Sequence, residues 1–431
     1  MRTHYANQLS AQDDGKEVVV AGWVHELRNM GKIAFMLVRD HSGIVQITAK
    51  KGIVDDAIMS EMNLPKESVV LVKGKVKANK EAKNGFEIVP AGITNLNPLS
   101  SEIPFEVTGK VPAEIDVRLD HRHIDLRRLE SKSIFNIQSS ILRSFRETLQ
   151  LEGFQEIVTP IIVEAATEGG TDLFEVKYFE KKAYLTQSPQ LYKQLAVIGG
   201  MDRIFMITKA MRAEKHNTVY HLNESTQMDI EMGFADHTDA IRMLKKVAAG
   251  IINNVIKWNG NDLEQLSVKL QRADPDSIKE ITYREAIDAL AKENEQLKFG
   301  DDLNRKDEEE LCRIYGDILM VKEYPTAARA FYSMPKEGDE EVCNSFDLLY
   351  KGLEISSGAQ RIHIPSMLMD ALKGRGINPD EFEFYINAFR NGAPPHAGWS
   401  IGLERMTMKL TNMPNIRECS MFPRDRTRVT P

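Results

Sequence analysis

The chain has 431 residues, of which 42% are hydrophobic and 28% are charged, and its formal net charge is −7. This length predicts two or three domains, and the acidic balance disfavours a protein held to nucleic acid by bulk charge alone. The three cysteines form no Cys-x-x-Cys pair and no apolar run approaches the ~20 residues that span a bilayer, so we expect a cytoplasmic protein with reduced thiols and no membrane segment.

Residues 1–105 carry the pattern of a small β-barrel. Short apolar runs separated by glycine and polar breaks predict strands, and a helical patch at residues 54–62 lies between the third and the fourth. The predicted strands are residues 17–24, 33–38, 43–49, 69–76 and 86–89. Five strands with one inserted helix are typical of an OB-fold barrel, whose face binds single-stranded nucleic acid. A barrel that binds nothing gives the same pattern, so the function of this segment stays open.

A linker and a long helix follow the barrel. Residues 106–133 are charged and marked by Pro112, which predicts a hinge segment braced by ion pairs. Beyond it, apolar residues at spacings of three or four form one stripe on a helix, namely Ile134, Ile137, Ile141, Phe145 and Leu149. This stripe suits either the protein core or a second copy of the chain.

The remaining residues, 134–431, predict a domain with a mainly antiparallel sheet flanked by helices. Neither a Gly-x-x-x-x-Gly-Lys motif nor a regular β-α-β rhythm is present. Residues 263–325 are charged and helix-rich, and we interpret them as an inserted helical subdomain. The fold class predicted for the whole chain is α+β and multidomain. Strand-like runs lie among the helices at residues 183–186, 204–208, 228–234 and 353–357.

A first candidate binding segment runs from Met211 to Met232. It places alternating cations and carboxylates between two apolar strand-like runs. Arg212 suits an anionic oxygen and Glu214 suits an amino group, because polar groups between strands need a partner or a ligand. An ion-paired surface hairpin is the alternative interpretation of this segment.

Two further segments indicate a nucleotide and a hard cation. Asp347 and Glu354 stand among hydroxyls and glycines, as ligation of Mg²⁺ beside a polyphosphate requires. Arg405 follows Gly402 at the predicted start of a helix, where an arginine suits an anion.

These segments resemble the signature motifs of class II aminoacyl-tRNA synthetases, and the whole chain closely resembles the aspartyl enzymes of the archaeal and eukaryotic type. Residues 153–160 resemble the first motif, the Arg212 segment resembles the second, and the segment from Gly402 to Asp425 resembles the third. The chain departs from this family at Met211, where phenylalanine is usual, and at Ala397, where glycine is usual. Alanine fits there only if its φ is negative or no ligand approaches its backbone closely.

The resemblance implies an enzyme that activates L-aspartate with ATP and Mg²⁺ and transfers the aspartyl group to tRNA(Asp). Implied catalytic residues are Arg212, Glu354 and Arg405, and implied metal ligands are Glu354, Ser357 and Asp347. Implied ATP contacts are Arg212, Ala213, Glu214, Tyr220, His221, Leu222, Glu354, Gly402, Leu403, Glu404 and Arg405. Implied aspartate contacts are Glu168, Gln190, Leu191, Tyr192, Lys193, Arg212, Asp229, Ser357 and Arg361. Lys193 and Arg361 are expected to bind the side-chain carboxylate, Arg361 through a bidentate fork.

In the barrel, the resemblance implies anticodon contacts from His25, Arg28, Phe35, Gln46 and Lys83. Relatives confined to tRNA(Asp) tend to carry Trp where His25 stands, together with a lysine in the loop that here contains Lys83. Relatives that charge both tRNAs tend to have His and to lack that lysine, so this chain has one mark of each kind, His25 and Lys83. Because a bulky indole can block a wrong base, whereas a lysine can at most favour one carbonyl pattern, the absence of the indole predicts that tRNA(Asn) is charged as well. The resemblance also implies a homodimer.

Other functions share parts of this pattern. An asparaginyl-tRNA synthetase or an asparagine synthetase can be built on the same catalytic fold, and Lys193 and the intact barrel argue against each in turn. A catalytically silent paralogue that only binds RNA is a further alternative. The presence of Arg212, Glu354 and Arg405 disfavours it.

Overall fold

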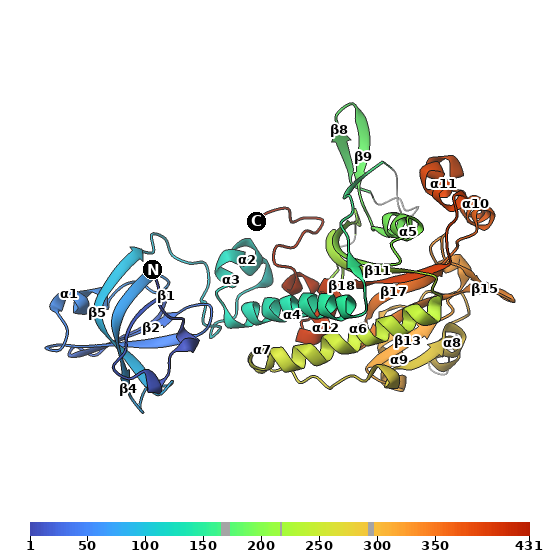
Figure 1. Ribbon diagram of the computed structural model, residues 1–431. Coiled ribbons are helices and arrows are strands. Elements are labelled where there is room, and N and C mark those ends of the chain that lie inside the picture. Colours follow the sequence, from blue (N-terminus) through green and yellow to red (C-terminus); the bar gives the residue numbers. More distant parts are fainter. Residues whose placement is uncertain (165–172, 216–217, 292–296) are drawn as a thin grey trace. The chain divides into compact units, whose positions relative to one another are not determined.

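The computed structural model describes residues 1–164, 173–215, 218–291 and 297–431. The chain forms two compact units, Met1–Glu114 and Ile115–Pro431, each with its own hydrophobic core (Figure 1). Within the described ranges, none of the helices has the length and apolarity that crossing a membrane requires.

The first unit is a closed β-barrel, which confirms the predicted OB-fold. Its strands follow the order β1-β2-β3-β5-β4. Alternate residues of β1 are buried, among them Val18, Val20 and Val24, because successive side chains of a strand point to opposite faces. The bounds are β1 (Glu17–Asn29), β2 (Ile33–Arg39), β3 (Ile44–Lys50), α1 (Asp56–Glu61), β4 (Val69–Ala78) and β5 (Phe86–Asn97), after the 3₁₀ turns η1 (Ala6–Gln8) and η2 (Ala11–Asp13).

The second unit is built on a sheet that has eight strands within the described residues, in the order β12-β13-β16-β17-β18-β11-β10-β6. The edge pairs β12–β13 and β10–β6 are parallel and the pairs between them are antiparallel, which confirms the predicted sheet type. The bounds are β6 (Gln155–Glu156), β10 (Arg203–Met211), β11 (Glu224–Gly233), β12 (Lys279–Thr282), β13 (Ile318–Lys322), β16 (Ser345–Tyr350), β17 (Glu354–Arg361) and β18 (His396–Gly402). Smaller sheets contain β7 (Ile162–Val163), β8 (Glu175–Tyr178), β9 (Lys181–Leu185), β14 (Pro335–Lys336) and β15 (Asp339–Cys343).

Two long helices, α4 and α6, pack against each other and against one face of this sheet (Figure 1). The stripe predicted on α4 is buried there: the rings of Phe145 and Trp399 lie 6.3 Å apart between centroids. Trp399 Nε1 also donates to the carbonyl of Ala240 on α6 at 3.1 Å. The stripe therefore faces the core. The helix bounds are α2 (Ile115–Asp120), α3 (Arg122–Asp125), α4 (Leu129–Leu151), α5 (Gln190–Ile198), α6 (His237–Trp258), α7 (Gly260–Gln265), α8 (Tyr283–Leu290), α9 (Arg305–Tyr315), α10 (Pro365–Gly374), α11 (Glu383–Arg390) and α12 (Leu403–Thr411).

Two predicted boundaries differ from the structure. Residues 115–133, predicted as part of a linker, belong to the second unit, because buried Arg122 pairs with Asp125 and donates to the carbonyl of Glu418 at 3.1 Å. Residues 263–325, predicted as an inserted helical subdomain, supply β12 and β13 to the main sheet. Strands this short are defined by their pairing with β16 and with each other more than by their own pattern.

Candidate functional site

A cavity lies on the face of the sheet opposite α4 and α6. Side chains of two central strands, β18 and β11, point alternately into the core and toward this cavity. On β18, Trp399 and Ile401 point into the helix-covered core, so Ser400 points the other way. On β11, Met228 and Ile230 take the core side for the same reason, and Asp229 lines the cavity. The cavity has a volume of ≈ 370 Å³.

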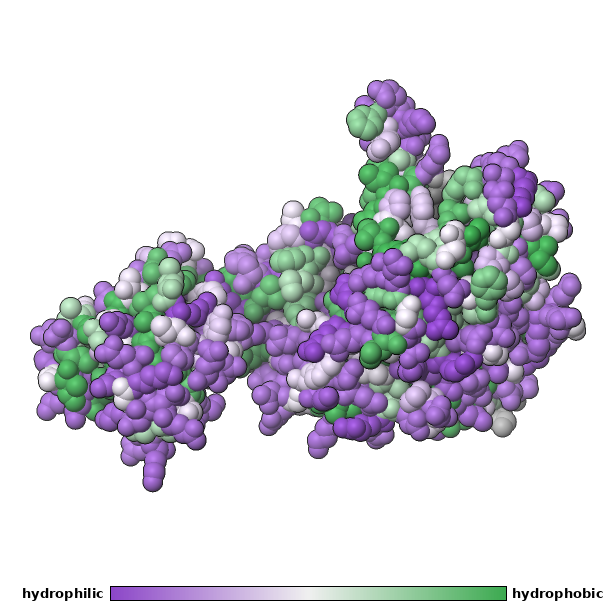
Figure 2. Space-filling model, in the orientation of Figure 1, coloured by the Kyte–Doolittle hydropathy of each residue, from purple (hydrophilic) through white to green (hydrophobic). Residues whose placement is uncertain are grey.

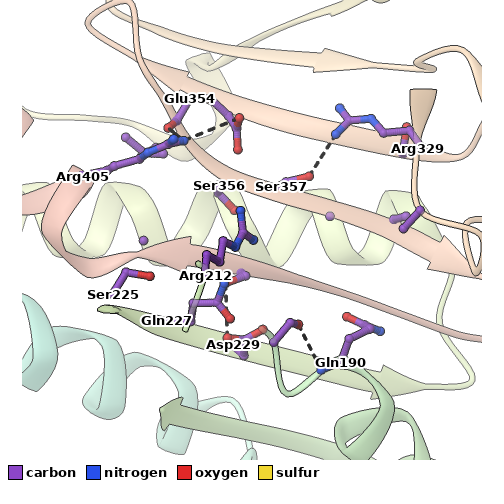
Figure 3. Close-up of a pocket in the computed structure, with 18 of the residues that line it drawn as sticks. Gln190, Arg212, Ser225, Gln227, Asp229, Arg329, Glu354, Ser356, Ser357 and Arg405 are labelled. Carbon is purple, nitrogen blue, oxygen red and sulfur yellow. Dashed lines mark hydrogen bonds and ion pairs between the residues drawn. The ribbon is translucent and has the colours of Figure 1, made fainter. Parts of the chain in front are cut away.

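One end of the cavity holds Arg405 and Glu354. Arg405, in the first turn of α12, donates from Nη1 to the carbonyl of Glu354 at 3.0 Å and lies 3.6 Å from its carboxylate (Figure 3). Burial, followed by the charge of Asp347, raises the pKa of the Glu354 carboxyl. A cation bound beside this carboxyl would favour its charged form.

Arg329, which the sequence analysis did not single out, joins two of the three predicted metal ligands. Its Nη1 donates to Ser357 Oγ at 3.1 Å, and its Nη2 forms an ion pair with Asp347. Burial alone lowers the pKa of Arg329, but the acidic groups around it, Asp347 first, together outweigh this, and the net shift is upward. Asp347 therefore faces an arginine and lies behind the cavity wall, whereas Glu354 and Ser357 line the cavity.

The other end of the cavity contains four buried charges. Lys193 Nζ lies 2.8 Å from Asp229 Oδ1 and 3.5 Å from Glu231 Oε2. Arg361 makes a fork with Glu231, with Nε to Oε1 at 2.9 Å and Nη2 to Oε2 at 3.3 Å. Burial raises the pKa of Glu231, yet the charges of Arg361 and then Lys193 shift it downward overall. The fork expected for a substrate is thus engaged by Glu231, a residue that the sequence analysis did not identify.

Most other predicted contacts are brought together here, and a few are not. The predicted residues that line the cavity are Gln190, Lys193, Arg212, Glu214, Tyr220, His221, Leu222, Asp229, Glu354, Ser357, Arg361, Gly402, Glu404 and Arg405. Leu191 and Leu403 are instead buried in hydrophobic clusters, and Tyr192 and Ala213 are not among the lining residues. Glu168 lies outside the described residues.

Ala397, one of the two departures from the family pattern, fits the strand that carries it. It pairs with Met232 and Gln360 inside β18, and its φ is not positive. The condition set by the sequence, a negative φ at this position, is therefore met.

The start of α9 reaches the Glu354 end of the cavity, although no sequence feature indicated this. Glu308 accepts a hydrogen bond from the backbone N–H of Glu354 at 3.2 Å. Arg305 lies over the ring of Tyr220 at 4.9 Å from its centroid. Burial, followed by the charge of Glu354, raises the pKa of Glu308 to about 7.

A second cavity, of ≈ 660 Å³, lies on the outer face of the barrel. Arg28, Phe35 and Gln46 line it, as expected for a binding surface. Glu87 also lines it and is only 5% exposed. Its Oε2 accepts hydrogen bonds from three neutral side chains, Thr48 at 2.8 Å, Asn79 at 3.0 Å and Gln46 at 3.4 Å. No sequence pattern points to Glu87, since a glutamate in a strand is usually exposed.

His25 and Lys83 are not among the lining residues of this barrel cavity. His25 sits at an irregularity of β1, where the pairing with β2 shifts between Val24 and Glu26. Its Nδ1 lies 2.7 Å from Nη1 of Arg39, whose other nitrogen is 2.9 and 2.8 Å from the two carboxylate oxygens of Glu67. Because arginine only donates, Nδ1 accepts, and the imidazole proton is on Nε2.

Comparisons with known proteins agree with this architecture. Residues 114–426 match the class II tRNA synthetases (D, K and N), and residues 18–96 match the OB-fold nucleic acid binding domain. The Aspartate--tRNA(Asp/Asn) ligases of Methanococcus vannielii and Methanocaldococcus jannaschii are each 46% identical to this chain, over 100% of it and 98% of their own length.

Solved structures of aminoacyl-tRNA synthetases share this fold over nearly the whole chain. The asparaginyl-tRNA synthetase from Pyrococcus horikoshii complexed with asparaginyl-adenylate has a TM-score of 0.93 at 30% identity, covering 99% of both chains. The aspartyl tRNA synthetase from Entamoeba histolytica has a TM-score of 0.88 at 30% identity, covering 99% of this chain and 92% of its own. The fold and the site thus define a class II synthetase with an OB-fold domain. Within that class, the chain belongs to the family of aspartate–tRNA ligases, which confirms the resemblance found in the sequence.

Proposed function

We propose that the protein activates L-aspartate with ATP and transfers the aspartyl group to tRNA(Asp) and tRNA(Asn). The observation that carries the choice of amino acid is the buried pair of cations in the cavity. Lys193 has three N–H donors, of which Asp229 and Glu231 can engage two. The fork between Arg361 and Glu231 uses Nε and Nη2, so Nη1 of Arg361 takes no part in it. The donors that remain suit a substrate carboxylate, and asparagine would leave them without a charged partner.

Activation joins the α-carboxylate of aspartate to the α-phosphorus of ATP and releases pyrophosphate. No protein nucleophile is needed, so the residues act by alignment and by neutralising charge in the transition state. Arg212 lies between the Glu354 end and the Asp229 end of the cavity in Figure 3, which suits contact with both the carboxylate and the α-phosphate. Arg405 is placed for the outer phosphates. A terminal hydroxyl of tRNA then attacks the activated carbonyl and releases AMP.

The chemistry of the donor set fits Mg²⁺ at the Glu354 end. Glu354 and Ser357 would supply oxygen ligands from the cavity wall, whereas Asp347, the third expected ligand, lies behind the wall and is paired with Arg329, which also donates to Ser357. Within the described residues, no group of three or more acidic, histidine or cysteine side chains is arranged as a self-contained metal site. This favours an ion held jointly with the phosphates of ATP. Bound there, Mg²⁺ would neutralise phosphate charge.

The barrel supports tRNA binding, and its cavity offers what an anticodon base requires. Phe35 provides a ring for stacking, and Gln46, bonded to Glu87, provides a hydrogen-bonding edge. His25, which does not line this cavity, carries a smaller ring than the indole that can block a wrong base. The curated relatives reported above are named for both tRNA(Asp) and tRNA(Asn), which supports relaxed specificity in this chain.

The surface near β7, β8 and β9 supports a homodimer. Figure 2 shows hydrophobic residues gathered over this region. Val158 is 96% exposed and Phe179 is 74% exposed, and Ile162 and Tyr178 are exposed as well. Apolar side chains gathered on a surface indicate a protein interface, and a second copy of the chain is the proposed partner.

The free, buried thiols of the three cysteines suit a reducing compartment, so we place the enzyme in the cytoplasm.

The test is amino-acid-dependent exchange of pyrophosphate into ATP, followed by charging of the two tRNA transcripts. We expect exchange with aspartate and not with asparagine. Exchange with asparagine would indicate an asparaginyl enzyme, and no exchange would indicate a silent RNA-binding protein. A preference for tRNA(Asp) over tRNA(Asn) in kcat/KM beyond about a hundredfold, roughly 2.7 kcal/mol, would contradict the relaxed specificity.

A further inference from the structure

A chain of hydrogen bonds runs behind the amino-acid end of the cavity. Gln190 and Gln194 lie one turn apart on α5, and Gln190 Nε2 donates to Gln194 Oε1 at 2.9 Å. Gln194 Nε2 lies 2.9 Å from His396 Nε2, and His396 Nδ1 lies 2.8 Å from the carbonyl oxygen of Pro394. Tyr385 of α11 donates to Gln194 Oε1 at 2.9 Å. Gln190, Gln194 and His396 are all buried.

The direction of every hydrogen bond in this network follows from the Pro394 carbonyl, at the end farthest from Gln190. A carbonyl oxygen only accepts, so the Pro394 carbonyl requires the proton of His396 on Nδ1. Burial lowers the pKa of His396, which favours the neutral ring. In that ring Nε2 is an acceptor, so Gln194 must turn its NH₂ group toward His396. Its Oε1 then receives Gln190 and Tyr385.

The amide of Gln190 is therefore oriented by residues that do not line the cavity. Its Nε2 is committed to Gln194, and Oε1 has no hydrogen-bond partner among the described residues. Gln190 and Asp229 both line the cavity, and Figure 3 shows them on the same side of it. The two groups together offer oxygen acceptors, whereas the neighbouring cations Lys193 and Arg361 offer only donors.

We propose that Gln194 and His396 are positioning residues for the amino acid, which hold Gln190 Oε1 toward the cavity as an acceptor for the α-ammonium group beside Asp229. If His396 carried a second proton, Gln194 would have to reverse, and Gln190 would then present its NH₂ group, which repels an ammonium ion. The hydrogen-bond network thus decides whether Gln190 presents an acceptor or a donor to the α-ammonium group. The inference rests on the proposed function, because it assumes aspartate in this cavity.

The experiment compares two probes, L-aspartate and succinate, which has the same carboxylates and lacks the amino group. Gln194→Met keeps the side-chain length and removes the hydrogen bonds to Gln190, His396 and Tyr385. We expect its Kd for aspartate to rise about tenfold or more, while its Kd for succinate stays within about twofold of the wild-type value. The ratio of the two constants does not depend on the folded fraction. Equal losses for both probes, or no loss, would overturn the proposal.

A double-mutant cycle asks whether Gln194 acts through Gln190. Gln190→Met should reproduce the selective loss of aspartate, and adding Gln194→Met to it should change the Kd for aspartate little. Additive losses would overturn the proposal, since they would mean an independent action. Gln265→Met, the same change at an exposed position of α7, is the matched control and should leave both constants unaltered.

A second variant carries the test if Gln194→Met does not fold. His396→Phe keeps an aromatic ring beside Phe389, whose centroid lies 6.0 Å away, and removes the acceptor to which Gln194 donates. It should show the same selective loss for aspartate over succinate. Failure of the proposed function would look different, because the wild-type protein itself would then show no exchange with aspartate.

Discussion

The catalytic cavity and the barrel cavity bury charge in different ways. In the catalytic cavity, buried cations and carboxylates occur in pairs, Lys193 with Asp229 and Arg361 with Glu231. In the barrel cavity, the buried carboxylate of Glu87 is held by neutral donors. Removing one member of an ion pair leaves a buried charge without a partner, whereas removing a neutral donor costs about one hydrogen bond. The first cavity thus suits charged substrates, and the second suits the neutral edges and faces of bases.

The largest expected effect separates the two cavities completely. Glu354→Gln should lower adenylate formation by about a thousandfold or more, because charge stabilisation in the transition state is lost. Binding of tRNA by the barrel should stay within about twofold of wild type. Pyrophosphate exchange and a filter-binding assay measure the two quantities, and Glu340→Gln at an exposed position of β15 is the control. Parallel loss of both activities would indicate misfolding and defeat the assignment.

Breaking a buried ion pair tests the amino-acid end. Lys193→Met leaves Asp229 and Glu231 short of a cation, a change that costs about 3–5 kcal/mol in buried pairs. We expect the KM for aspartate to rise about a hundredfold or more, with a much smaller change for ATP. Lys182→Met, at a side chain that is 75% exposed, is the control. An unaltered KM for aspartate would contradict the proposal that Lys193 and Arg361 select aspartate.

Loss of an aromatic ring tests the barrel cavity. Phe35→Ala removes the stacking surface, which contributes about 1–3 kcal/mol per base. The expected result is a rise in the KM for tRNA of about tenfold with unchanged pyrophosphate exchange. Phe384→Ala, at a ring that is 53% exposed on α11, controls for loss of an aromatic residue. If exchange fell together with tRNA binding, the two cavities would not be independent.

The smallest effect concerns stability and pH. Glu308 has a pKa of about 7 in the folded protein and an ordinary value of 4.5, so the folded state binds more protons between these values. Stability should therefore fall as pH rises from about 4.5 to 7 and level off above. Glu308→Gln removes this slope and should be more stable than wild type by about 2–3 kcal/mol at pH 8, relative to the difference at pH 5. Urea unfolding of the catalytic unit at both values, without ATP or Mg²⁺, measures it. Identical slopes would contradict the burial of a charged Glu308.

The sequence by itself determined the features that are local in the chain. Alternation of apolar residues predicted the barrel strands, and the absence of a β-α-β rhythm predicted the antiparallel sheet. The motif spacing identified Arg212, Glu354 and Arg405, which the structure brings into one cavity. These features could be found because periodicity and short motifs are written into adjacent residues.

The tertiary structure alone decided which partner each buried charge takes. Glu231 lies 130 residues from Arg361 in the sequence, and no pattern near either residue indicates their fork. Arg329 and Glu308 reach the Glu354 end from segments without a recognisable motif, and β12 and β13 become strands through pairing with distant residues. Periodicity records which face of an element is buried, whereas the pairing of charges depends on which elements the fold brings together.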